Sequence, residues 1–153
     1  METSTAPPSW RVGRALMILA ALAYGPLPSA IDTFDRFHLT HPSWSDHARL
    51  HLLWLIFACS YLGLTAAYLA WRATPRSLEP LHQSARLGGL LLGAFFSAGI
   101  VKDAVGASFG PPEHFVRGFP IPVLHFGAAA ATLGVGYALC LRAARSLPPE
   151  TTP

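Results

Sequence analysis

Four long apolar stretches limit what this chain can fold into more than any other feature of its sequence. They cover residues 14–33, 50–71, 87–108 and 119–141. Each is long enough to cross a membrane as a helix, since a hydrocarbon core of ~30 Å needs about 20 helical residues. The sequence therefore predicts an all-α integral membrane protein, folded as a four-helix transmembrane bundle.

The composition supports this class and leaves little room for a separate soluble domain. Of the 153 residues, 52% are hydrophobic and 12% are charged, outside the usual range of soluble domains. We expect a single transmembrane domain over residues 1–153, with disordered tails at 1–9 and 146–153. Any chemistry then has to lie within the bundle or in its short loops.

The first apolar stretch also has features of a secretory signal. The run RVGRALMILAALAYGPLPSA has a basic start, an apolar middle and small residues at its end. Pro28 lies close to the possible cleavage position and fits such a signal poorly, so we expect an uncleaved first helix. Pro26 and Pro28 lack backbone donors, and we expect them to kink or unwind the outer end of this helix.

The basic residues predict how the bundle is oriented in the membrane. Seven of the eleven lie in the N-terminal tail, the second loop, the C-terminal tail or the adjoining helix ends. The seven are Arg11, Arg14, Arg72, Arg76, Arg86, Arg142 and Arg145, and those on the opposite side are Arg36, Arg49, Lys102 and Arg117. Because short cytoplasmic loops retain Lys and Arg, we expect both termini to lie in the cytoplasm. We expect the bundle itself to lie in a bacterial-type inner membrane. This asymmetry accounts for the net charge of +3 without a nucleic-acid partner.

Each of the four stretches has titratable residues near its outer end. They are Asp32 in the first stretch, His47 and His51 at the start of the second, Asp103 near the end of the third and His125 near the start of the fourth. Ionisable side chains within a membrane are costly and usually face the bundle interior. Their similar depth therefore predicts one shared, outward-facing site.

The residue types at this level are typical of a transition-metal site. His47 and His51 are four residues apart, on one side of a helix, and this spacing lets two imidazoles bind one ion. We predict that His47, His51 and His125 bind Fe, Cu or Zn, with Asp103 or Asp32 completing the ligand set. Cys59 and Cys140 form no paired-cysteine motif, and we expect both to be packing residues.

Catalytic and substrate-binding residues are expected around this metal. The candidate catalytic residues are Asp103, Asp32 and Asp35, and the candidate substrate contacts are Trp54, Phe96, His38 and His41. A site that opens sideways to membrane lipid admits hydrophobic molecules, so we expect oxidation, hydroxylation or other metal-assisted chemistry on a small lipophilic substrate. Glu113 and His114 lie in an outer loop, where we expect them to be solvated.

Three alternatives to a metal enzyme stay open. A carboxylate held out of water beside a histidine can abstract and return a proton, which suits a metal-free isomerase or cyclase of a lipophilic substrate. His51 and His125 could instead be the axial ligands of a haem. The chain could also be a non-catalytic membrane subunit or ligand binder, as a homo-oligomer or beside a partner membrane subunit.

The run THPSWSDHARLHLLW, in the first outer loop and the start of the second stretch, is similar to a pattern in small bacterial membrane proteins. The pattern is Pro, any residue, Trp, two further residues, His-Ala-basic, an apolar residue and His, which here runs from Pro42 to His51. It covers about a tenth of the chain. The resemblance implies a four-helix membrane protein and transfers no reaction.

Overall fold

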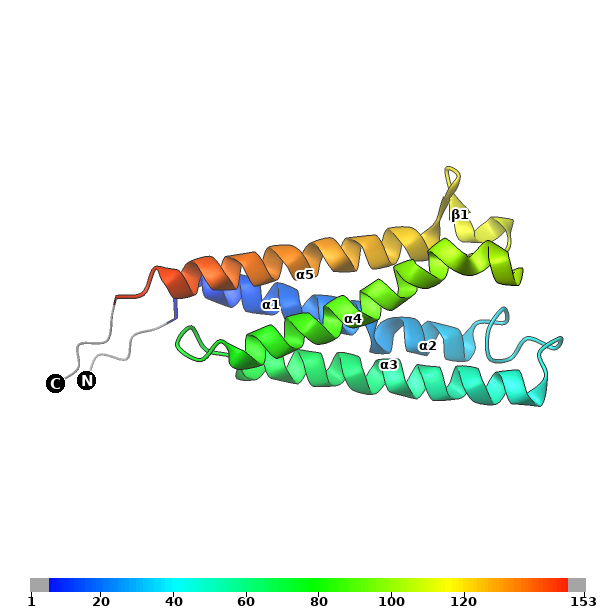
Figure 1. Cartoon of the computed structure of the whole chain (residues 1–153), viewed down its shortest axis with the longest axis horizontal. Helices are drawn as coiled ribbons and strands as arrows, with labels where there is room; N and C mark the ends of the chain where they lie inside the picture. Colours follow the sequence, from blue (N-terminus) through cyan, green and yellow to red (C-terminus); the bar gives the residue numbers. More distant parts are fainter. Residues whose placement is uncertain (1–5, 149–153) are drawn as a thin grey trace.

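A computed structural model describes residues 6–148 of the chain. In this range the protein consists mainly of helices that run side by side along one long axis (Figure 1). The helices are α1 (Pro8–Tyr24), α2 (Pro26–Phe34), α3 (Asp46–Arg72), α4 (Glu79–Val101) and α5 (Ile121–Arg145), with short 3-10 helices η1 (Lys102–Val105) and η2 (Pro112–His114). Strands β1 (Phe115–Val116) and β2 (Phe119–Pro120) form a small antiparallel hairpin before α5.

Four helical segments of residues 6–148 are long and apolar enough to cross a membrane. They are Pro8–Phe34, Asp46–Arg72, Glu79–Val105 and Ile121–Arg145. The predicted all-helical, four-segment architecture is confirmed. Helix α1 begins at Pro8, so the last two residues of the predicted 1–9 tail are helical, whereas residues 1–5 and 149–153 of the two predicted tails lie outside the described residues.

The first of these segments is broken in two at Gly25, as the prolines predict. Helix α1 ends at Tyr24 and α2 begins at Pro26, and Gly25 between them has non-helical dihedral angles of φ −112° and ψ −95°. Pro26 and Pro28 have no N–H group, so the carbonyls four residues before them cannot form the usual helical hydrogen bonds. The chain therefore changes direction here, and α2 becomes a separate element.

Helix α3 packs directly against this break. A Cβ atom on Gly63 would lie 2.8 Å from the Cα of Gly25, and a Cβ on Gly25 would lie 2.7 Å from the Cα of Gly63. Both glycines are needed because each lies against backbone that cannot move aside. The Ser29 hydroxyl lies 3.0 Å from the Gly25 carbonyl and 3.1 Å from the Ile56 carbonyl, which links α2 to α3.

Helices α1 and α5 also meet at a pair of glycines. A Cβ on Gly13 would lie 2.7 Å from the Gly136 carbonyl oxygen, and a Cβ on Gly136 would lie 2.7 Å from that of Gly13. The small residues of the third and fourth stretches predict their tightest contact with each other, and this expectation is wrong. A Cβ on Gly89, Gly93, Gly127 or Gly134 would meet nothing within 4 Å.

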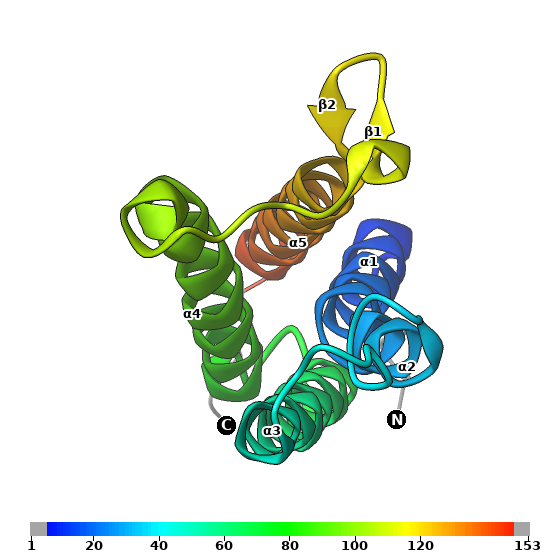
Figure 2. The same cartoon turned by 90° about the vertical axis from the view of Figure 1, so that its right-hand side faces the viewer.

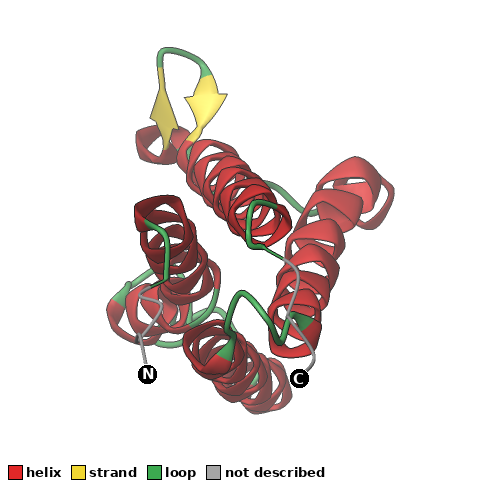
Figure 3. Cartoon of the chain, turned by 90° about the vertical axis from the view of Figure 1, so that its left-hand side faces the viewer, coloured by secondary structure: helices red, strands yellow, loops and turns green. Residues whose placement is uncertain are grey.

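The two ends of the bundle differ in which helices lie around its centre. At the end where α2 lies, α2, α3, α4 and α5 surround one region, and the connection from α4 to the β hairpin passes the end of α5 (Figure 2). At the other end α1 packs among α3, α4 and α5, and the β hairpin projects from the far side (Figure 3). The larger fully buried side chains include Trp10, Met17 and Tyr24, all from α1. Helix α1 is therefore the centre of the core.

Replacing Gly136 by alanine should destabilise the bundle by about 1–3 kcal/mol, because the added methyl group would overlap the α1 backbone. Gly134→Ala, on the same helix, is the matched control and should be neutral or stabilising by up to about 1 kcal/mol, since alanine favours helix and the space is open. Thermal unfolding of both variants in the same detergent measures the difference. Equal stabilities would contradict the close α1–α5 packing.

Candidate functional site

A cavity of about 1040 Å³ lies at the α2 end of the bundle. This volume is at the upper end of the range of about 300–1,000 Å³ typical of ligand pockets. Its apolar wall includes Ile56 from α3, Leu91 and Phe95 from α4, and Ile121 and Phe126 from α5. Its titratable lining residues are Tyr24, Asp32, Asp35, His38, His41, Cys59, His114 and His125. An apolar chamber with a few polar groups is the usual form of a binding site for a small molecule.

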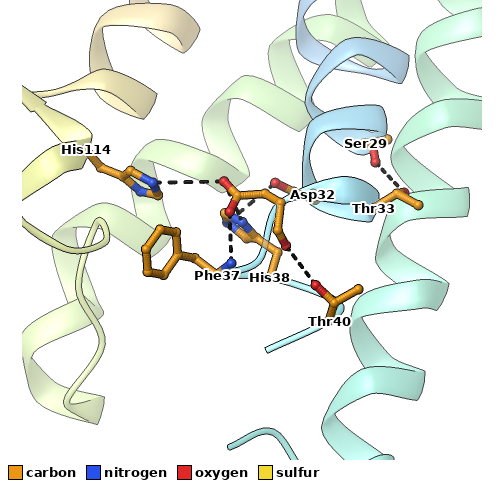
Figure 4. A network of polar contacts seen from close by, with 8 residues as sticks. Ser29, Asp32, Thr33, Phe37, His38, Thr40 and His114 are labelled. Atoms are coloured by element: carbon orange, nitrogen blue, oxygen red, sulfur yellow. Dashed lines mark hydrogen bonds and ion pairs between the residues drawn. The ribbon is translucent and has the colours of Figure 1, made fainter. Parts of the chain in front are cut away.

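Four of these polar residues form a cluster, and they come from two parts of the chain that are far apart in the sequence. Asp32 is in the last turn of α2, Asp35 directly follows that helix, His38 is in the next turn, and His114 comes from η2 (Figure 4). The turn is held by its backbone, since the N–H of His38 donates to the Asp35 carbonyl and the N–H of Leu39 to the Asp32 carbonyl. The end of α2 thus positions both carboxylates.

His38 lies between the two carboxylates. Its Nε2 atom is 3.5 Å from Oδ1 of Asp32, and its Nδ1 atom is 3.6 Å from Oδ2 of Asp35. The same Asp35 oxygen is 3.9 Å from Nε2 of His114, while the other Asp35 oxygen accepts a 2.8 Å hydrogen bond from the N–H of Phe37. The arrangement is a chain of alternating carboxylates and imidazoles along the cavity wall.

The contacts within this cluster are looser than direct hydrogen bonds. A well-formed N–H···O bond measures about 2.7–3.2 Å, and these imidazole–carboxylate distances are longer. The Nδ1 atom of His38 is buried and has no hydrogen-bond partner among the described residues. The side chains of the cluster are between 21% and 34% exposed, so each remains accessible from the cavity or its mouth. The imidazole of His38 can therefore shift toward a bound molecule.

His125 lines the cavity but is held by the broken helix. Its Nε2 atom is 2.7 Å from the carbonyl oxygen of Ala23, in the last turn of α1. A carbonyl only accepts, so Nε2 of His125 is the donor. The last carbonyls of a helix have no donors within it. His125 thus satisfies a backbone group that the break at Gly25 leaves free.

The structure does not bring the predicted metal ligands together. His47 and His51 lie side by side on α3, with their Nε2 atoms 3.1 Å apart, as their spacing predicts. Both are exposed and neither lines the cavity, whereas His125 does. Within residues 6–148, no group of three His, Cys, Asp or Glu side chains could hold a metal ion. The haem hypothesis also needs His51 beside His125, and these two face different surroundings.

The remaining predicted residues divide between the cavity and other surfaces. Asp32, Asp35, His38 and His41 line the cavity. Asp103 is 83% exposed and lies 2.7 Å from Nζ of Lys102, and Trp54 is 67% exposed beside His51. Phe96 lines a separate groove between α4 and α5. The cavity thus contains two of the three predicted catalytic residues and two of the four predicted substrate contacts.

Two residues of the site differ from their sequence-based expectations. His114, expected to be solvated in an outer loop, is only 21% exposed and faces Asp35. Cys59, expected to be a packing residue, lines the cavity from α3. A loop histidine close to Pro111 and Pro112 gives no periodicity from which its direction could be read.

The two cysteines report on the cavity, because only one of them lines it. We expect methyl methanethiosulfonate to modify Cys59 quickly in the folded protein and Cys140 slowly, since Cys140 is completely buried. Mass spectrometry of peptides after timed quenching measures both rates. In Cys59→Ser the fast modification should disappear, and its persistence would show that the cavity does not reach Cys59.

No family model, no curated protein and no solved structure matches the chain. The function therefore has to be argued from the geometry of the cavity.

Proposed function

We propose that the chain is a multi-pass membrane protein with both termini in the cytoplasm. The four membrane-length segments support this placement. Many large apolar side chains are exposed along the bundle, and they include Leu19, Leu55, Leu64, Leu90 and Val135. Such a surface is unusual for a soluble monomer and suits contact with lipid tails. The excess of arginine at the end where α1 begins supports the orientation. We accordingly propose that the cavity lies at the outer side of a bacterial-type inner membrane.

Within this frame, we propose that the protein is a metal-free isomerase or cyclase that acts on a small lipophilic molecule. The observation that carries the proposal is His38, held between two carboxylates on the wall of an apolar cavity. Removing a proton from one carbon and returning one at another moves a double bond. That reaction leaves the oxidation state of the substrate unchanged, so acid–base groups suffice for it.

The contacts favour different roles for the two carboxylates. Asp35 accepts the Phe37 N–H and faces both His38 and His114, so it is suited to orient imidazoles. Asp32 accepts no such backbone hydrogen bond from residues 6–148, and it faces the other nitrogen of His38. We assign Asp32 and His38 to proton transfer and Asp35 to the positioning of His38. General acid–base groups of this kind contribute about 10²–10⁴-fold to a rate.

The rest of the cavity wall supports a lipophilic substrate. The rings of Phe95 and Phe126 stack with centroids 4.1 Å apart, and Phe109 lies next to Phe95. These three rings line the cavity together with aliphatic side chains of α3 and α4. Such a wall favours binding by removal of apolar surface from water, at roughly 25 cal/mol per Å². The substrate therefore has to be mainly apolar.

Deuterium exchange tests the proposed reaction even while the substrate is unidentified. Small molecules that co-purify with the protein in lipid nanodiscs are incubated in D₂O and analysed by mass spectrometry. The wild type should incorporate deuterium into a bound molecule, and Asp32→Asn should slow this by about 10²-fold or more, because its amide cannot act as a base. A bound molecule that gains no deuterium would instead favour the non-catalytic binder.

Two further variants make this experiment specific. Asp46→Asn is the matched control, because Asp46 is fully exposed at the start of α3 and should leave exchange unchanged. Asp103→Asn tests whether the catalytic carboxylate is Asp103, as the sequence predicts, or Asp32, as the geometry of the cavity indicates. Loss of exchange in Asp103→Asn would support the sequence-based catalytic role, whereas retention would support the cluster at Asp32.

Metal binding at His47 and His51 is a second candidate function, favoured by the 3.1 Å between their Nε2 atoms. Zn–N bonds are about 2.0–2.1 Å, so one ion can contact both atoms. Isothermal titration with Zn²⁺ or Cu²⁺ should show binding that weakens about tenfold or more in His51→Ala and persists in His41→Ala. Unchanged binding in His51→Ala would exclude the pair as the ligand site.

A further inference from the structure

The lining of the cavity contains more acidic side chains than Lys and Arg side chains. Asp32 and Asp35 contribute carboxylates, and none of its lining residues within the described range is Lys or Arg. The nearest partners of these carboxylates are histidines. Among the described lining residues, acidic side chains therefore outnumber the permanently charged basic ones.

Three basic side chains contact lining residues without lining the cavity themselves. Arg49 donates to the His41 carbonyl at 3.2 Å, Lys102 lies 5.6 Å from the ring centre of Phe109, and Arg36 lies over Phe37. Nζ of Lys102 is 2.7 Å from Asp103, and Nη1 of Arg49 is 3.6 Å from Asp46. The guanidinium of Arg36 lies 4.7 Å from the ring centre of Phe37. These three basic side chains are balanced against four carboxylates, two in the cavity and two beside it, so acidic groups remain in excess.

Aromatic rings add a second feature that favours positive charge. Six of them line the cavity, namely Tyr24, Phe37, Trp44, Phe95, Phe109 and Phe126. Two of these rings already attract cations of the protein itself, since Arg36 lies over Phe37 and Lys102 over Phe109. The face of an aromatic ring attracts a cation within about 6 Å of its centre, most strongly when water is excluded. Carboxylates at one end and ring faces along the walls therefore favour the same kind of ligand.

We infer that the molecule bound in the cavity is a lipophilic cation. Its apolar body occupies the part lined by α3, α4 and α5, and its positive group lies near Asp32 and Asp35. The inference rests on the proposed function, because it uses the same cavity, and it adds the charge of the substrate. Fatty-acid carboxylates and organic phosphates would be repelled by the two aspartates.

Cys59 provides a direct measurement of this charge preference, since it lines the same cavity. Its modification is followed with two thiosulfonates of similar size, one with a trimethylammonium group and one with a sulfonate. The ratio of the cationic to the anionic rate should exceed the ratio for free cysteine by about tenfold. It should fall toward the free-cysteine value in Asp32→Asn and stay high in Glu79→Gln, which changes an exposed carboxylate at the opposite end of the bundle. A ratio at or below that of free cysteine overturns the inference.

Ligand protection then distinguishes failure of this inference from failure of the proposed function. Decyltrimethylammonium, decanol and decanoate are compared in nanodiscs for protection of Cys59 against neutral methyl methanethiosulfonate. The cation should protect at about tenfold lower concentration than decanol, and decanoate least well. Equal or better protection by decanol or decanoate overturns the inference while the cavity remains a lipophilic site. If none of the three protects Cys59, the lipophilic cavity and the inference both fail.

Discussion

The break in the first helix at Gly25 is the constraint on which the site depends. Two prolines remove backbone donors there, and the Ala23 carbonyl, in the last turn before the break, accepts a hydrogen bond from His125. The absence of a side chain on Gly63 lets α3 approach the break, and Ser29 links α2 to the Ile56 carbonyl. Because of these contacts, α2 lies against α3 with Asp32 at its end, facing the cavity instead of lipid.

An apolar cavity with two carboxylates needs compensation for their charge. Removal of a carboxylate from water is costly unless it is paired or hydrogen-bonded. Here the compensation comes from the Phe37 N–H and from histidines 3.5–3.9 Å away. In the described part of the chain, neither carboxylate forms an ion pair with Lys or Arg. Such pairing is incomplete, and it leaves the carboxylates able to interact with a proton or a cation. This is the physical link between the geometry, the proposed acid–base chemistry and the charge of the ligand.

The histidines show how far prediction from sequence reaches. The common level of Asp32, His47, His51, Asp103 and His125 near one end of the bundle follows from residue number, since each helical residue rises 1.5 Å. The spacing of His47 and His51 likewise predicts their contact, which the structure confirms. Their direction does not follow, because it depends on how each helix is rotated against its neighbours. That rotation turns His47 and His51 outward on α3 and His125 inward on α5.

By itself, the sequence determined the four membrane-length helices, the break at the prolines and the end of the bundle at which titratable groups gather. Hydrophobic length and missing backbone donors are local properties, and each is read from a short run of residues. Only the tertiary structure decided that Asp32, Asp35, His38 and His114 share a cavity with Cys59, while Asp103 pairs with Lys102 outside it. The reason is that glycine contacts between distant helices set their approach and rotation, and the loop that carries His114 has no periodicity of its own.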